Sequence, residues 1–314
     1  MNRLQAYAAI ATIIGVVIAA VALIPQFGEW LDSRNKTAPA TNSPSIESTT
    51  PSATSQPAPL PGVVVVPVDK LANTIPWLSL DKTARPGTNF YGFNLTKPPF
   101  DNRLVRQAFA AAVNRQAIAD LANRLGTKNA QPSTTFTPPE TLGRDLYGEV
   151  GIPYDPEKAK TLLAEAGYPN GQGFPEVILT TNKGGGITSG ANIEIANAVA
   201  AMWQEHLKVT VKVEVVDDFQ AYLDRLARDA PTIFRYGWAA DFNDPDNFLR
   251  EAFQSNSEVN RGHFSNAEFD RLVGEAATSS DPITRQSFYI QAEHILCEDQ
   301  VAIIPLYHAT YNIP

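Results

Sequence analysis

The sequence of 314 residues contains a single cysteine and no cluster of basic residues. Because Cys297 has no second cysteine to pair with, the chain forms no internal disulfide and builds no thiolate metal site. We predict that Cys297 is a small buried hydrophobe rather than a nucleophile. The net charge of −8, without any lysine or arginine stripe, argues against nucleic-acid binding and suits cationic or zwitterionic partners.

Signatures of catalytic, metal and cofactor sites are also missing. The four histidines, His206, His263, His294 and His308, have no ligand spacing, so no metal site is expected. No Gly-x-Ser-x-Gly elbow occurs, and the glycine run at 184–186 lacks the Lys-Ser/Thr ending of a P-loop. We interpret that run as a turn. The sequence therefore predicts a protein that is not an enzyme and that carries no cofactor.

Residues 1–30 differ in kind from the rest of the chain. The stretch 4–24 is almost entirely apolar and is followed by Pro25, which is about the length that crosses a bilayer as a helix. It predicts a single-pass membrane anchor. A cleaved secretory signal is the alternative, because Ala20-Val21-Ala22 offers a small-x-small site. The region 31–61 is rich in Pro, Ser and Thr and predicts a disordered stalk, which favours an extracytoplasmic soluble domain over a cytoplasmic linker.

The folded region is expected at residues 62–314. Short apolar runs predict strands at 63–66, 89–95, 177–180, 209–216, 232–236 and 302–307. Apolar residues at helical spacing predict helices at 101–113, with Asp101 as cap, and at 115–125, 156–166, 192–207, 219–228, 266–277 and 281–296. This alternation predicts an α/β fold with a mixed sheet flanked by helices, in which ligands lie beyond the carboxyl ends of strands.

The most informative stretch is Gly237–Leu249, with the sequence Gly-Trp-Ala-Ala-Asp-Phe-Asn-Asp-Pro-Asp-Asn-Phe-Leu. It places an aromatic ring, Trp238, and a carboxylate, Asp241, after the strand expected at 232–236. An aromatic wall beside a negative charge suits a pocket for a cationic organic ligand. Asp241 lies between Trp238 and Phe242, where an unpaired carboxylate is costly unless a cation arrives.

The other acids of this stretch admit further interpretations. Asp241, Asp244 and Asp246 are candidates for paired catalytic acids or for calcium ligands. The distal glutamate and the spacing of an EF-hand loop are missing, and the sequence identifies no separate partner for acid–base catalysis. We therefore predict that residues 243–245 form a turn and cap a helix that starts near Asp246.

Several motifs occur in order between Phe90 and Tyr307. They are Tyr-Gly-Phe-Asn-Leu at 91–95, Lys-Pro-Pro-Phe-Asp-Asn at 97–102, Val-Arg-Gln-Ala at 105–108, Leu-Leu-Ala-Glu-Ala-Gly-Tyr-Pro-Asn-Gly at 162–171 and the block 237–249. Together they resemble the signature of family 5 extracellular solute-binding proteins, the oligopeptide- and dipeptide-binding components of ABC importers.

The resemblance implies a periplasmic-binding-protein-like (type II) fold, in which two lobes close over an extended peptide. In this family the aspartate of the Gly-Trp block receives the α-ammonium group of the peptide, which implies that role for Asp241. Trp238 and Phe242 then shape the neighbouring pocket. Arg235 matches a position that meets a peptide carboxylate, and a surface ion pair is the alternative for it.

The resemblance stops short of a whole family member. Most of a first lobe usually precedes the motif at 97–102, whereas this chain has a membrane span, a stalk and a short stretch at 63–81. We therefore expect a single C-terminal lobe, with an ABC permease or a separately encoded first lobe as partner. The leading hypothesis is a membrane-anchored solute-binding domain for peptide transport or sensing. A scaffold module that lost ligand capture is the alternative, and an enzyme comes third.

Overall fold

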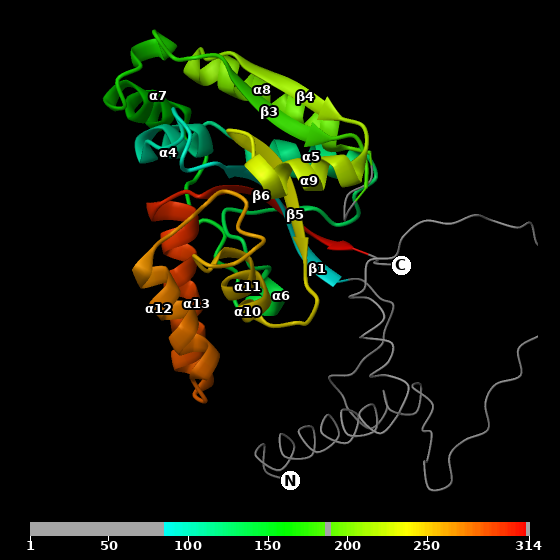
Figure 1. The fold of residues 1–314 in the computed structure, drawn as a ribbon, viewed down its shortest axis with the longest axis vertical. Helices are drawn as coiled ribbons and strands as arrows, with labels where there is room; N and C mark the ends of the chain where they lie inside the picture. Colours follow the sequence, from blue (N-terminus) through cyan, green and yellow to red (C-terminus); the bar gives the residue numbers. More distant parts are fainter. Residues whose placement is uncertain (1–84, 186–189, 312–314) are drawn as a thin grey trace, which may run out of the picture. The chain divides into compact units, whose positions relative to one another are not determined.

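The computed structural model describes residues 85–185 and 190–311 (Figure 1). The six strands of their sheet are β1 Arg85–Phe93, β2 Gln131–Pro132, β3 Val177–Asn182, β4 Val211–Val216, β5 Ile233–Ala239 and β6 Ile303–Tyr311. The helices of the first half are α4 Arg103–Ala111, α5 Arg115–Arg124, α6 Pro139–Leu142, α7 Pro156–Glu165 and the 3₁₀ turn η1 Pro169–Gly171. Those of the second half are α8 Asn192–Leu207, α9 Phe219–Asp229, α10 Pro245–Phe248, α11 Arg250–Phe253, α12 Ala267–Thr278, α13 Pro282–His294 and the π-helical turn η2 Ile295–Asp299.

The sheet is mixed, with strand order β2-β6-β1-β5-β3-β4. β3 is parallel to both β4 and β5, whereas β1 is antiparallel to both β5 and β6. The register of β1 and β6 pairs Arg85 with Tyr311. An α/β fold with a mixed sheet flanked by helices is thus confirmed for these residues.

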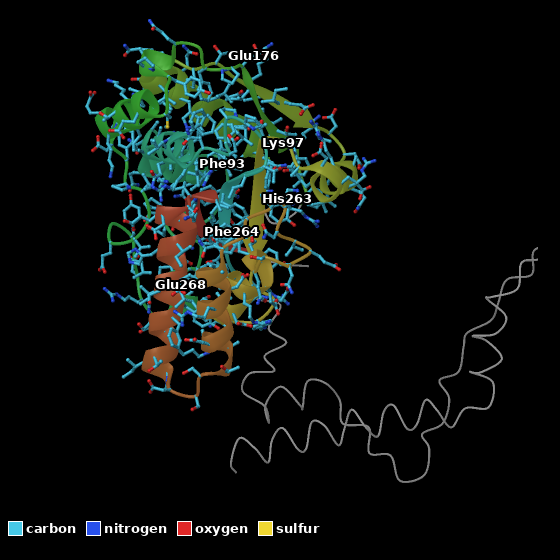
Figure 2. The ribbon with its side chains drawn as sticks, turned by 60° about the vertical axis from the view of Figure 1, so that its left-hand side comes forward. Phe93, Lys97, Glu176, His263, Phe264 and Glu268 are labelled. Carbon is cyan, nitrogen blue, oxygen red and sulfur yellow. The ribbon has the colours of Figure 1, made fainter. Side chains whose placement is uncertain are left out.

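Two helical layers cover the two faces of the sheet. Alternate residues of β1 point to opposite faces, so Tyr91 and Phe93 join one core and Phe90 joins the other. The first core lies under α4, α5, α7 and α8, where Trp203 of α8 donates its indole N–H to the carbonyl of Phe109 at 2.9 Å. The second lies under α10 to α13. In Figure 2, Phe93 of β1 marks the first core, and Glu268 marks α12 of the second helical layer.

Most elements start and end within one to three residues of the prediction, since local periodicity determines them. Asp155 caps α7 as expected. Several details of the prediction were wrong. β1 begins at Arg85 rather than 89, and β6 ends at Tyr311 rather than 307. The cap of α4 is Asn102 rather than Asp101, because the amide oxygen of Asn102 accepts the Leu104 N–H at 2.9 Å. β5 continues to Ala239, because its pairing with β1 extends that far.

The predicted anchor at 4–24, stalk at 31–61 and strand at 63–66 lie outside the described residues. Within residues 85–185 and 190–311, no helix has both the length and the apolar character needed to cross a membrane. Cys297 is buried, as predicted, and burial raises the pKa of its thiol well above the ordinary value.

A buried polar network fixes the loop that follows β2. The two ring nitrogens of His308 lie 2.8 Å from the Thr88 hydroxyl and 2.6 Å from the Ser133 hydroxyl. Thr88 donates to the carbonyl of Phe136 at 2.6 Å, and the buried carboxylate of Glu293 accepts the Phe136 N–H at 2.8 Å. The loop is therefore attached to β1, β6 and α13 together.

This network predicts a pH-dependent stability. Burial lowers the pKa of His308 from 6.5 to about 3, so its ring stays neutral in the folded chain while the unfolded chain takes up a proton. Stability from this residue is present above pH 6.5 and falls by about 1.4 kcal/mol per unit as the pH drops towards 3. Urea unfolding at several pH values between 7 and 5 measures the unfolding free energy. This free energy should change less with pH for His308→Gln than for the wild type. An equal dependence on pH would contradict the role of His308.

Candidate functional site

β5 has one open edge. It pairs with β1 along its whole length but with β3 only at Ile233 and Phe234. The Ala240 N–H donates to the carbonyl of Pro86 at 2.9 Å, so Ala240 is in a hydrogen-bonded pair with β1. Hydrogen-bonded and non-hydrogen-bonded pairs alternate along an antiparallel ladder, so Gly237 and Ala239 are in pairs without hydrogen bonds to β1. Their backbone N–H and C=O groups therefore point to the edge away from β1. No other described strand pairs with that edge, which makes it a template for an extended chain.

One buried amide organises the turn that follows β5. The side chain of Asn247 is fully buried, and its oxygen accepts the indole N–H of Trp238 at 3.0 Å and the backbone N–H of Asp241 at 3.2 Å. Its NH₂ group donates to Glu251 at 2.8 Å. Sequence reasoning missed this residue, because nothing in the pattern of the block separates Asn247 from a helix-capping polar residue. It fixes the positions of Trp238 and Asp241 relative to each other.

The structure gives Asp241 a partner that the sequence did not suggest. Its side chain is 73% exposed and lies 3.5 Å from a guanidinium nitrogen of Arg85, at the start of β1. The cation beside this carboxylate is thus a residue of the chain itself. Phe242 is exposed and Trp238 is half-buried, so Asp241 is exposed to water. Exposed ion pairs of this kind contribute little stability and exchange partners easily.

The neighbouring acids are part of the scaffold, as the turn-and-cap interpretation predicted. Asp244 caps α10 by accepting the backbone N–H of Asp246 at 2.8 Å, and it pairs with Arg285 at 2.7 Å. The carboxylate of Asp246 accepts from Arg250 at 2.8 Å and from the hydroxyl of Tyr289 at 3.0 Å. Among the described residues, no group of three or more histidine, cysteine and acidic side chains is placed to hold a metal ion.

Arg235 lies on the opposite face of β5 from Trp238. It is 3% exposed, which rules out the surface ion pair considered from the sequence. Its Nε donates to the side-chain oxygen of Asn89 at 3.1 Å, and Nη1 donates to that of Asn182 at 3.5 Å. Nη2 is buried and has no hydrogen-bond partner in the described part of the chain. Burial raises the pKa of the nearby Tyr91 hydroxyl, so this tyrosine supplies no negative charge to balance the arginine.

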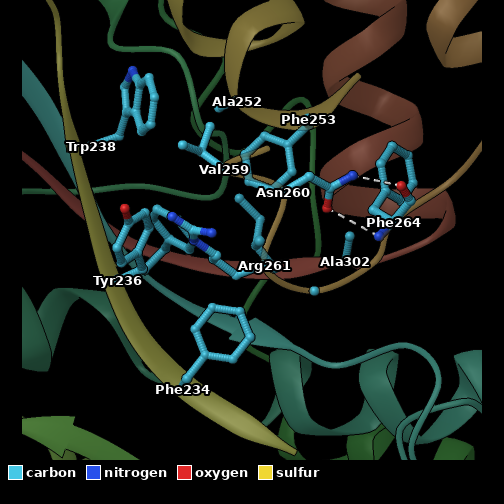
Figure 3. Close-up of a pocket in the computed structure, with 14 residues that line it drawn as sticks. Phe234, Tyr236, Trp238, Ala252, Phe253, Val259, Asn260, Arg261, Phe264 and Ala302 are labelled. Carbon is cyan, nitrogen blue, oxygen red and sulfur yellow. Dashed lines mark hydrogen bonds between the residues drawn. The ribbon is translucent and has the colours of Figure 1, made fainter. Parts of the chain in front are cut away.

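The four predicted site residues therefore fall into two groups. Trp238, Asp241 and Phe242 lie together at the carboxyl end of the open edge, whereas Arg235 lies at its other end and beneath the surface. A recess opens on the face of β5 that carries Trp238, and Tyr236 also lines it (Figure 3). The open edge of residues 235–239 is thus bordered by an acid, an arginine and an aromatic-lined recess.

Known proteins share this architecture. Residues 52–260 match the model of the bacterial extracellular solute-binding proteins, family 5 Middle. The periplasmic oligopeptide-binding protein OppA of Escherichia coli is 32% identical over 70% of this chain and 39% of its own length. The probable deoxycholate-binding periplasmic protein YgiS of Escherichia coli is 33% identical over 71% of this chain and 40% of its own. The chain thus spans about two fifths of the length of these relatives.

A solved structure gives the same picture. The periplasmic oligopeptide-binding protein OppAIV of Borrelia burgdorferi superposes with a TM-score of 0.64 at 28% identity. The superposition covers 78% of this chain and 47% of that one. The matched part is therefore about half of that solved structure.

The role of Asn247 can be tested without any ligand. In Asn247→Ala the indole N–H of Trp238 and the backbone N–H of Asp241 lose their acceptor, which should cost about 1–3 kcal/mol of unfolding free energy. The proton resonance of the Trp238 indole N–H should shift in an NMR spectrum. Trp203 serves as internal control, because its N–H bond to Phe109 is separate. An unmoved Trp238 resonance would refute this role.

Proposed function

The chain belongs to family 5 of the bacterial extracellular solute-binding proteins, and from this membership we propose that its open β5 edge binds an extended peptide or a similar zwitterionic solute. The observation that carries the proposal is the unpaired backbone of Gly237 and Ala239 between Asp241 and Arg235. Extended peptides add to such an edge through main-chain hydrogen bonds, and side-chain pockets then give specificity.

The charges at the two ends of the edge give the peptide a direction. Asp241 follows the carboxyl end of β5 and offers a carboxylate for the α-ammonium group. Arg235 stands nearer the amino end and offers a guanidinium for the α-carboxylate. A peptide that uses both groups therefore runs antiparallel to β5. Trp238 and Phe242 add aromatic surface beside the ammonium position, which favours a cation further.

Arg235 is suited to bind the α-carboxylate of the peptide. Its Nη2 has no hydrogen-bond partner among the described residues, and no described carboxylate balances its charge. A carboxylate would supply a charge-assisted bond. Since Arg235 is buried, the incoming group has to displace the Asn182 contact, which at 3.5 Å is the weaker of the two that hold the guanidinium.

The wider setting follows from the relatives. We propose that residues 4–24 anchor the chain in the cell membrane and that the described domain is extracytoplasmic, as the word periplasmic in the names of OppA and YgiS suggests. The described edge is half of a cleft, so a separately encoded first lobe or an ABC permease is the proposed partner.

A scaffold role is the second candidate. It is favoured by the Arg85–Asp241 ion pair, which occupies the ammonium position, and by the burial of Arg235. In that case the fold remains while ligand capture is lost. Peptide titration of the chain separates the two functions.

Asp241→Asn should weaken binding of a free tetrapeptide about tenfold, because the ammonium group loses its counter-charge. Isothermal titration calorimetry of the full chain measures the affinity. The N-acetylated peptide should bind wild type and variant equally, and Asp120→Asn, an exposed acid on α5, should leave both affinities unchanged. No binding by the wild type, or equal binding by Asp241→Asn, would reject the peptide proposal for this chain.

Arg85→Gln should have the opposite effect. Removing the guanidinium frees Asp241, so the affinity for the free tetrapeptide should rise by a few fold, in keeping with the small energy of an exposed ion pair. Raising the salt concentration should reduce the difference between variant and wild type. A loss of affinity would show instead that Arg85 helps to hold the ligand.

A further inference from the structure

The recess beside β5 is built from two segments that are far apart in the sequence. One wall is the face of β1 and β5 that carries Phe90, Tyr236 and Trp238, and the other is the loop between α11 and α12, whose residues Val259 and Arg261 line it (Figure 3). The recess measures about 350 Å³, including the part open to solvent. Its enclosed interior has room for about one water molecule, so an incoming side chain would occupy mainly the open part.

The loop that carries Arg261 is held on both sides. Asn260 accepts the Phe264 N–H at 3.1 Å and donates to the Phe264 carbonyl at 2.7 Å. The next residue, Gly262, lies so close to β1 that an added Cβ would stand 2.3 Å from the Phe93 carbonyl oxygen. Figure 2 labels Phe93 and Phe264, the two anchoring points. Arg261 is thus presented from a fixed backbone.

The guanidinium of Arg261 is incompletely satisfied. Nη1 donates to the carbonyl of Glu258 at 2.8 Å, whereas Nε is buried and has no hydrogen-bond partner in the described part of the chain. Within the described residues, no carboxylate forms an ion pair with this guanidinium. A buried N–H donor of a cation, surrounded by aromatic rings, is costly without an acceptor. The side chain extends across the recess towards Tyr236 (Figure 3).

We propose that this recess is a specificity pocket that receives an acidic side chain of the bound peptide, with Arg261 as the residue that selects it. The inference rests on the proposed function, because the peptide has to lie along the open edge of β5. Side chains of an extended peptide alternate between the two faces of the sheet, so some of them point to the face that bears Tyr236 and Trp238.

The shape of the recess favours glutamate over an aromatic residue. Its two methylene groups would lie in the open part of the recess, which Tyr236 and Trp238 line, and its slim carboxylate would meet the guanidinium of Arg261. There the carboxylate accepts the unpaired Nε–H in a charge-assisted bond. A wholly apolar side chain would fill the same recess but would leave that N–H without an acceptor.

The test uses the full chain and tetrapeptide amides with a free amino terminus. Amidation removes the α-carboxylate, so the only peptide carboxylate is that of a side chain. Tetra-alanine amide is compared by calorimetry with four variants that carry one glutamate each and with the matching glutamine peptides. At one position glutamate should bind about tenfold more tightly than alanine or glutamine.

Arg261→Gln should abolish this glutamate preference and leave the affinity for tetra-alanine amide unchanged. Arg261→Lys should retain part of it, because lysine keeps the charge without the fixed fork of donors. Arg228→Gln, an exposed arginine on α9, is the matched control and should bind as wild type does. Thermal unfolding of each variant shows that the fold is kept.

The two proposals fail in different ways. Binding of tetra-alanine amide without glutamate preference at any position overturns the role of the recess and leaves the proposed function standing. A preference that persists in Arg261→Gln also overturns it. If the wild type binds none of the peptides, the proposed function itself is rejected, and the specificity pocket with it.

Discussion

The whole arrangement depends on the double antiparallel pairing of β1. This strand lies between β5 and β6, and both neighbours pair with it over nearly its full length. Two close contacts need glycine: a Cβ on Gly87 would stand 2.4 Å from the Trp238 carbonyl, and one on Gly92 would stand 2.4 Å from the Phe234 ring. Because β1 takes one edge of β5, and β3 separates from the other after Thr180, the backbone of residues 235–239 is left half-paired.

The arginines of the described domain that carry buried N–H groups include two kinds. Arg106 and Arg115 donate only to backbone carbonyls, including those of Gln300, just after η2, and Pro305, in β6. Burial lowers the pKa of each to about 10. They attach helices to the sheet, and neither has a buried donor without an acceptor among the described residues. Arg235 and Arg261 each keep a buried N–H without an acceptor. Arg106 and Arg115 find their hydrogen-bond acceptors within the chain. The buried N–H groups of Arg235 and Arg261 lack one, so a ligand group is most readily expected there.

Local patterns predicted most of the fold, because helix α8 and the cap of α7 depend on residues close in sequence. The features that define the site were less accessible. Arg85 and Asp241 are 156 positions apart, and only the pairing of β1 with β5 brings them together. The same pairing extends β5 past Tyr236. No periodicity reveals that an amide such as Asn247 is shared between an indole and a backbone N–H, since that depends on three-dimensional approach.

The pairing of Arg85 with Tyr311 has a consequence for how such a domain can be built into larger proteins. The first residue of β1 and the last of β6 are neighbours on the sheet. A segment joined through both strands would leave every strand pairing intact. This adjacency of two residues far apart in the sequence is the geometry that circular permutation requires.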